Sequence, residues 1–275
     1  MTAVALIIGN HGTPDQLDLC LASLYAQDHT DFETLVADSG HDDRSDDVVA
    51  HHAAHLAGGV RHIQAPGSDA NLASALNAAV LSTMAEYLVF LGGDCVAQPK
   101  FISAHVSVAD YGYFGYSETL PLDSAITGAI NARSLGTGLA FEERWLESVS
   151  PAWHARHLKG TALGKFKDWL NRDTPGLRYW NADSSSCFRD ELLAINGFDR
   201  DVEDGRLERD VANRLQNNGQ EPVSAGPAGN VLRLLPPGDD WRALSGGRLP
   251  AELAPGGEVR AVNGLEELTT EADAA

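Results

Sequence analysis

Short apolar runs alternate with segments of helical periodicity along residues 3–91. The apolar runs have the length of buried strands and lie at residues 3–8, 32–37, 60–64 and 86–91. Between them we expect helices over residues 14–27, 44–56 and 70–84. Strands that alternate with helices through short connections are typical of a parallel sheet with helices on both faces, so the sequence predicts an α/β fold.

The pattern is less regular further along the chain. We expect a strand over residues 111–116, a mostly helical stretch over 136–170, a short helix over 189–195 and an amphipathic helix over 207–218. Gly219 ends the last of these helices. Pro, Gly, Ala and acidic residues dominate from Pro236 onward, which predicts a domain over residues 1–235 and an irregular C-terminal tail over 236–275.

Ligands of parallel α/β sheets bind at the carboxyl ends of the strands. The loops that follow Ile8, Ala37 and Leu91 are therefore the expected place for chemistry. Two of these loops carry an acid at the strand end, Asp38 and Asp94. We expect both carboxylates at one edge of the sheet.

The chain is strongly acidic, with 39 Asp and Glu against 20 Lys and Arg and a formal net charge of −19. Such a field repels nucleic acid and anionic lipid, so neither is an expected partner. A bound anion would need a local cation, a helix N-terminus or an arginine to reverse that field.

The cysteines and the N-terminus both bear on the compartment in which we expect the protein, the cytoplasm. The odd number and wide spacing of Cys20, Cys95 and Cys187 predict reduced thiols. The N-terminus enters the first strand without a charged leader, and no apolar run is long enough to span a membrane. We therefore expect a cytoplasmic protein with no membrane span.

Three segments of the first half carry a recognisable pattern. Residues 35–40 (LVADSG) end a strand in an acid, residues 71–79 (NLASALNAA) form an Asn-bounded helix start, and residues 90–99 (FLGGDCVAQP) surround a Gly-Gly-Asp turn. They resemble the donor side of the family 2 glycosyltransferases. The third is similar to the segment that carries the family's Asp-x-Asp motif.

Downstream, three further segments follow in the same order. They are residues 180–190 (WNADSSSCFRD), 195–199 (INGFD) and 210–215 (DVANRL). This run resembles the C-terminal acceptor segment of galactosyltransferase-type enzymes.

The two resemblances together imply a GT-A fold, with a nucleotide-binding half over 1–110 and an acceptor half over 111–235. They also imply a nucleotide-sugar donor. The implied nucleotide-binding residues are Gly9, Asn10, His11, Asp38, Asn71, Gly93 and Asp94. The implied acceptor-binding residues are Trp180, Asn181, Asp183 and Asp210.

Glu208 is the candidate catalytic residue. In the family the base is the aspartate of a Glu-Asp pair one turn before an Asp-x-x-x-Arg-Leu stretch, and aligning on Asp210 and Arg214 puts Leu207 and Glu208 at that pair. Glutamate can accept a proton from an acceptor hydroxyl. The alternative is an exposed acid at a helix start, where it favours the helix dipole.

The resemblance implies a divalent cation, Mn²⁺ or Mg²⁺, with Asp94 as its ligand. The sequence departs from the family twice, because Gly92 stands where the first Asp of the motif belongs and no histidine follows His157. Two alternatives stay open. Asp94 could hold a weak ion together with the diphosphate, or Arg233 or a cation of the patch over 156–167 could replace the ion.

The sequence therefore predicts an inverting glycosyltransferase that uses a UDP- or GDP-sugar and a soluble small-molecule, glycan or peptide acceptor. Two alternatives stay open. One is a degenerate family member that binds a sugar nucleotide or a partner without turnover, and the other is a GT-A enzyme that transfers a different group. The sequence also leaves open whether the chain forms a homodimer.

Overall fold

The computed structural model describes residues 3–40, 43–65, 71–153, 180–236 and 257–274. Its main sheet has seven strands in the order β3-β2-β1-β4-β8-β6-β9. These are β1 (Val4–Asn10), β2 (Phe32–Asp38), β3 (Val60–Gln64), β4 (Tyr87–Gly92), β6 (Tyr113–Tyr116), β8 (Ser184–Phe188) and β9 (Glu221–Ser224). Strand β8 runs antiparallel to both of its neighbours and the other pairs are parallel. The prediction of an α/β fold with a mostly parallel sheet is confirmed.

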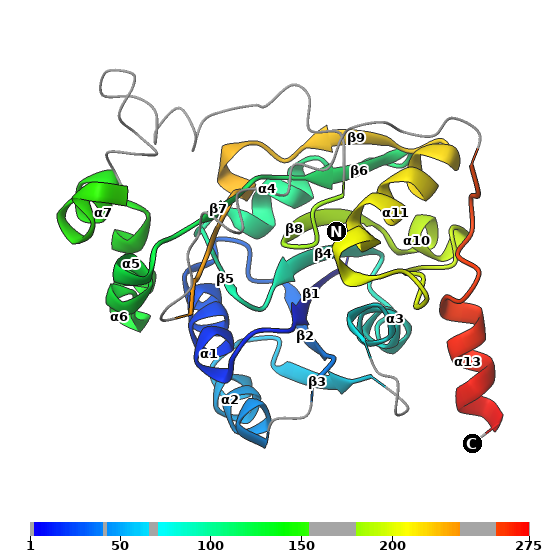
Figure 1. The fold of residues 1–275 in the computed structure, drawn as a ribbon, viewed down its shortest axis with the longest axis horizontal. Helices are drawn as coiled ribbons and strands as arrows, with labels where there is room; N and C mark the ends of the chain where they lie inside the picture. The colour runs from blue at the N-terminus through cyan, green and yellow to red at the C-terminus, as the bar shows by residue number, and fades with distance from the viewer. Residues whose placement is uncertain (1–2, 41–42, 66–70, 154–179, 237–256, 275) are drawn as a thin grey trace.

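Helices cover both faces of this sheet (Figure 1). They are α1 (Pro14–Ser23), α2 (Asp43–Ala53), α3 (Leu72–Ser82), α4 (Phe101–Ser107), α10 (Arg189–Ala194), α11 (Asp204–Asn217) and α13 (Leu265–Ala274). Side chains of β1 alternate between two cores, as the period of a strand requires. Ala5 and Ile7 pack with α3, α11 and α13, whereas Leu6 and Ile8 pack with α1, α2 and α4.

A small second sheet lies beside the first, in the order β5-β10-β7. Its strands are β5 (Cys95–Ala97), β7 (Thr119–Pro121) and β10 (Val231–Arg233). The helices α5 (Ser124–Ala129), α6 (Ala132–Gly136) and α7 (Glu143–Val149) pack against it in a third core. The antiparallel register of β10 and β5 pairs Arg233 with Cys95, and so brings the end of β10 to the loop after β4.

Two predicted helices are shorter in the structure. The expected helix over 14–27 ends at Ser23 and continues as a 3-10 turn, Leu24–Ala26. The expected helical stretch over 136–170 is broken after α6, because Gly138 adopts a left-handed φ of 74° before a second 3-10 turn, Leu139–Phe141. The rest of that stretch, with its basic patch over 156–167, lies outside the described residues.

The C-terminal tail differs from the irregular structure that its composition predicts. Residues 237–256 lie outside the described part, but 265–274 form α13. Leu265 and Leu268 are buried, and Leu265 belongs to the core between α3 and the sheet. Their spacing places both on one helical face, which the Pro- and Gly-rich surroundings obscure in the sequence. None of the helices within the described ranges is long and apolar enough to cross a membrane.

Candidate functional site

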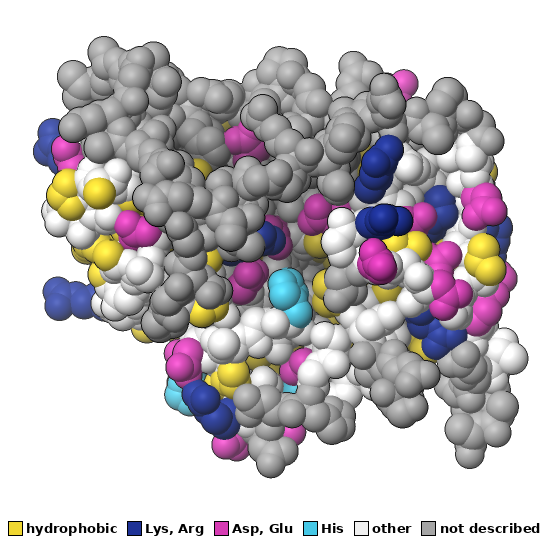
Figure 2. Space-filling model, viewed as in Figure 1, with side chains coloured by type: hydrophobic (Ala, Val, Ile, Leu, Met, Phe, Trp, Pro, Cys, Tyr) yellow, Lys and Arg dark blue, Asp and Glu magenta, His cyan; other side chains and the backbone are white. Residues whose placement is uncertain are grey.

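The carboxyl ends of β1, β2 and β4 meet at one edge of the sheet. The register pairs Asn10 with Asp38 across β1 and β2, and Gly9 with Gly92 across β1 and β4. The expectation that the strand-end acids share one edge therefore holds. On the face drawn in Figure 2, acidic, basic and histidine side chains gather in a hollow near the middle.

Asp38 is buried at the end of β2 and its carboxylate is held on several sides. Asn10 Nδ2 and His62 Nε2 donate to Oδ2 at 3.0 and 3.1 Å, and the amide of Gly40 donates to Oδ1 at 2.9 Å. Burial raises the pKa of Asp38, but these hydrogen bonds outweigh it and the pKa is lowered. The carboxylate is thus held ionised by its own neighbours.

The loop after β4 packs closely on the end of β1. The Gly93 amide donates to the Gly9 carbonyl at 2.9 Å, and a methyl group added at Gly93 would lie 2.8 Å from Asn10 Oδ1. Asn10 Oδ1 is buried and has no hydrogen-bond donor among the described residues. His11 is exposed, and a methyl group added at the next residue, Gly12, would lie 3.4 Å from Asp94 Cβ. These predicted nucleotide-binding residues come together.

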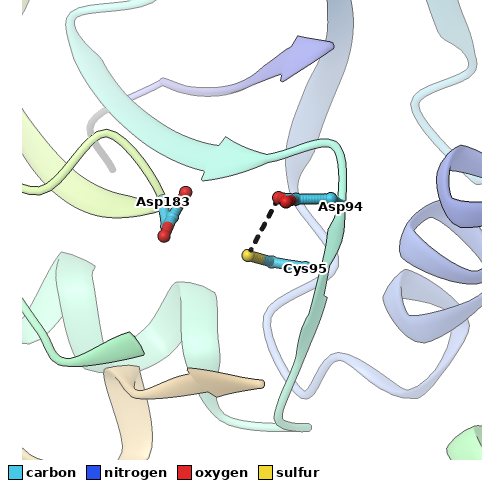
Figure 3. A group of neighbouring side chains, drawn as sticks. All are labelled: Asp94, Cys95 and Asp183. Carbon is cyan, nitrogen blue, oxygen red and sulfur yellow. Dashed lines mark hydrogen bonds between the residues drawn. The ribbon is translucent and has the colours of Figure 1, made fainter. Parts of the chain in front are cut away.

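Asp94, Cys95 and Asp183 form the group within the described chain whose donor atoms lie close enough to hold a metal ion, within 4.8 Å of one another (Figure 3). Cys95 Sγ is 3.4 Å from Asp94 Oδ1. Asp183 comes from the loop before β8, and its carbonyl accepts from the Gly92 amide at 3.3 Å. Two carboxylates that are far apart in the sequence therefore face one another at the strand ends.

Arg233 contacts both of these carboxylates. Its Nη2 donates to Asp183 Oδ2, and its Nε lies 3.4 Å from Asp94 Oδ2. Burial raises the pKa of Asp94, the charge of Asp183 raises it further, and Arg233 lowers it. Burial alone would lower the pKa of Arg233, but Asp183 and its other neighbours hold it above its ordinary value. The guanidinium is therefore permanently charged.

Glu208 reaches the same site from α11. Leu207 before it is buried in the main core, so Glu208 is directed to the loop before β8. Its Oε1 accepts from the amide of Ala182 at 2.9 Å. Burial and the charge of Asp183 raise the pKa of Glu208 to about 7. A carboxyl with a pKa near neutrality suits a general base, which a surface acid at a helix start would not.

Trp180, one of the implied acceptor-binding residues, presents no ring face to the site. It is buried in the main core, with its ring centroid 5.0 Å from that of Phe90 and 6.0 Å from that of Phe198, both edge-on. The tryptophan abuts the site in sequence only, because the chain turns between it and Asp183. Its apolar ring stabilises the core beneath the site.

Asn181 is also buried, and it ties the loop before β8 to its neighbours. Its side-chain amide donates to the Ser117 carbonyl at 2.6 Å, and its Oδ1 accepts from the Asp183 amide at 3.2 Å. The side chain is therefore engaged within the protein, and it fixes the backbone that carries Asp183.

Two other predicted residues are engaged in structural contacts. Asn71 caps α3, where its Oδ1 accepts from the Ser74 amide at 2.9 Å. Asp210 pairs with Arg214, with Nη2 to Oδ2 at 2.5 Å. Arg214 Nη1 in turn donates to the carbonyls of Ile195 and Gly197, at 2.8 and 2.7 Å. Their predicted ligand contacts stay predictions.

Sequence reasoning missed two features of the site. His62, which bridges Asp38 and Asp46, carried no signal, because only the register of β2 and β3 brings it to Asp38. The proximity of Asp183 to Asp94 was also missed. The one available signal was Gly92 itself, a glycine where the family pattern has an acid.

Comparisons with known proteins bear on this geometry. Residues 5–116 match the family Glycosyl transferase family 2. No match was found among curated protein sequences. The matched segment ends before residue 180, so the galactosyltransferase-type character of the C-terminal segment stays a prediction.

Solved structures share the fold at low identity. The mannosyltransferase PcManGT from Pyrobaculum calidifontis, in complex with GDP-Man and Mn²⁺, is 16% identical with a TM-score of 0.57, covering 86% of this chain and 58% of that one. S. aureus TarS is 11% identical with a TM-score of 0.55, covering 85% and 37%. GalNAc-T7 with UDP, GalNAc and Mn²⁺ is 8% identical with a TM-score of 0.56, covering 86% and 44%. The chain thus spans less than two thirds of each of these proteins.

Proposed function

We propose that this chain, whose residues 5–116 match glycosyl transferase family 2 and whose fold is shared with GT-A structures, is an inverting glycosyltransferase. It takes a sugar from a UDP- or GDP-sugar and transfers it to the hydroxyl of a soluble small-molecule, glycan or peptide acceptor. The observation that carries the proposal is the position of Glu208, a carboxyl of near-neutral pKa beside the carboxylate pair at the strand ends.

The nucleoside of the donor binds at the ends of β1 and β2. Support comes from the buried Oδ1 of Asn10, which lacks a donor among the described residues, and from the ionised Asp38 beside it. A base or ribose supplies N–H and O–H donors for such acceptors. The close packing of Gly9 and Gly93 lets backbone approach the ligand without a side chain between them.

Glu208 acts as the general base. It takes the proton of the acceptor hydroxyl while that oxygen forms a bond to the anomeric carbon. The bond from the anomeric carbon to the donor's β-phosphate oxygen breaks, and the nucleoside diphosphate leaves with the electron pair. Attack from the face opposite the leaving group inverts the anomeric configuration. Such proton transfer contributes roughly 10²–10⁴-fold to a rate.

A second candidate is a family member that binds a sugar nucleotide without turnover. One observation favours it, because the guanidinium of Arg233 stands between Asp94 and Asp183 and already pairs with both carboxylates without a ligand. An enzyme of this fold that transfers a group other than a sugar would also use Arg233 between Asp94 and Asp183.

The test is calorimetric titration of the protein with UDP, GDP and their sugar conjugates, followed by mass spectrometry of mixtures with acceptor panels. Binding of one nucleotide and the appearance of a glycosylated acceptor are expected. Binding with no product from any acceptor and no donor hydrolysis would favour the non-catalytic candidate. If no nucleotide binds, the proposal fails.

A further inference from the structure

Structures that share this fold were determined with Mn²⁺, so a divalent ion is the expected partner of a nucleotide diphosphate here. Among the described residues, the group that could hold such an ion is Asp94, Cys95 and Asp183. Mn²⁺ and Mg²⁺ prefer several oxygen ligands, and a thiol is a soft ligand. The chain thus offers two carboxylates for the ion, whereas it has no histidine at the strand that ends in Arg233.

Arg233 occupies the space between these two carboxylates. It hydrogen-bonds Asp183 through Nη2, and its Nε lies 3.4 Å from Asp94 Oδ2. A divalent ion bound to both oxygens would have to share that space with a permanent positive charge. Ion and guanidinium would repel one another, so the residues present do not fit a divalent ion.

The position of Arg233 is fixed by the sheet. Its backbone pairs with Cys95 in the register of β5 and β10, and the amide of the next residue, Leu234, donates to the Asp94 carbonyl at 2.8 Å. Val231 and Leu232 on the same strand are buried. A packed strand therefore carries Arg233, and the pairing of that strand with β5 places the guanidinium beside the two carboxylates.

One guanidinium atom is left without an acceptor. Arg233 Nε is buried and has no hydrogen-bond partner among the described residues, since its separation from Asp94 is that of an ion pair only. An unpaired buried donor costs free energy, and the cost is larger when the group is charged. A phosphate oxygen is an acceptor whose geometry and charge match a guanidinium donor.

We propose that Arg233 takes the place of the divalent ion, so that this chain binds a nucleoside diphosphate with its own guanidinium and without Mn²⁺ or Mg²⁺. The inference rests on the proposed function for the identity of the ligand. Asp94 and Asp183 hold the arginine in position, and its unpaired Nε donates to an oxygen of the leaving diphosphate. The carboxylates thereby have a different role from metal ligation.

The test measures two binding events separately. Mn²⁺ binding is followed by electron paramagnetic resonance for the protein as it is, for Arg233→Ala and for Arg233→His. We expect no binding to the unaltered protein and measurable binding to both variants, because removing the guanidinium frees the carboxylate pair. Mn²⁺ that binds the unaltered protein at least as tightly as Arg233→His would overturn the proposal.

Nucleotide binding is followed by calorimetry with UDP and GDP, in EDTA and in Mn²⁺. The affinity of the unaltered protein should be equal in both, and Arg233→Ala should weaken it roughly 10–100-fold. Arg233→Lys keeps the positive charge and should weaken nucleotide binding less than Arg233→Ala does. That difference separates the loss of the charge from a general defect in folding. Arg144→Ala removes an exposed arginine on α7 and should change neither measurement. A strict requirement for Mn²⁺ would refute the proposal.

The two arms separate this inference from the proposed function. If neither UDP nor GDP binds under any condition, the transferase proposal and the diphosphate role of Arg233 both fail. The Mn²⁺ arm still decides whether the arginine excludes the ion. If nucleotide binds only with Mn²⁺, the transferase proposal stands and the inference about Arg233 is wrong.

Discussion

The carboxylate of Asp183 occupies the space that a side chain at position 92 would need. A methyl group added at Gly92 would lie 2.6 Å from Asp183 Oδ1 and 3.1 Å from Asp94 Oδ1. The family pattern has an acid at this position, and here a distant acid fills the same volume. The missing carboxylate is thus replaced in space by one from the loop before β8.

The first prediction concerns this replacement. Gly92→Ala should displace Asp183 and disturb its pairing with Arg233, at a cost of about 1–3 kcal/mol in the free energy of unfolding. Gly128→Ala is the matched control, since nothing lies within 4 Å of its added methyl group and the residue is inside α5. The control should be neutral or stabilising by up to about 1 kcal/mol. Urea denaturation measures both, and equal stabilities would contradict the packing argument.

The second prediction concerns the base. Glu208→Gln should lower kcat roughly 10²–10⁴-fold and leave the nucleotide Kd within about twofold, because the amide keeps the shape but cannot accept the proton. Steady-state kinetics and calorimetry measure the two quantities. Glu203→Gln, an exposed change at the start of the same helix, should alter neither. Unchanged turnover in Glu208→Gln would remove Glu208 as the base.

The third prediction is a pH profile. The pKa of Glu208 is raised to about 7, and a general base works only when deprotonated. The logarithm of kcat/KM should therefore rise with pH below about 7 and level off above it. Activity measured from about pH 5 to about pH 9 tests this. A profile that is flat through about pH 7 would show that another group limits the reaction.

The fourth prediction concerns the nucleoside end of the site. Asp38→Asn should weaken UDP or GDP binding by roughly 10–150-fold, through the loss of a charged acceptor worth about 1.5–3 kcal/mol. His62 also loses its carboxylate partner, and its pKa, which the Asp38 hydrogen bond raises, should fall. Calorimetry measures the affinity and nuclear magnetic resonance titration the pKa.

The control for that change is Asp31→Asn, which removes an exposed acid before β2. Its nucleotide affinity should match that of the unaltered protein. If Asp38→Asn binds nucleotide equally well, Asp38 serves to hold Asn10 and His62 and does not contact the ligand.

The fifth prediction separates core from site at Trp180. Trp180→Ala should cost about 3–5 kcal/mol in unfolding free energy, because the ring fills the core against Phe90 and Phe198. Acceptor KM, measured at a temperature where the variant is folded, should change little. A large rise in KM with stability unchanged would restore the acceptor-binding role of Trp180.

Much of the fold follows from local patterns. The expected third strand coincides with β3, Val60–Gln64, and the other early strands and helices differ from expectation by a few residues at their ends. Strand alternation and helical spacing are set by neighbours in sequence, so they can be read directly. The strand-end positions of Asp38 and Asp94 follow for the same reason, because a parallel sheet has one carboxyl edge.

The tertiary structure alone decided what meets these acids. Asp183 and Arg233 reach Asp94 through the antiparallel strand β8 and the β5–β10 register, which no local pattern encodes. Trp180 is close to Asp183 in sequence, but its ring points into the core and packs edge-on against Phe90. The sequence by itself determined the frame and the strand-end acids, since these depend on neighbouring residues. Only long-range pairing decided that an arginine, and a carboxylate from another strand, would complete the site.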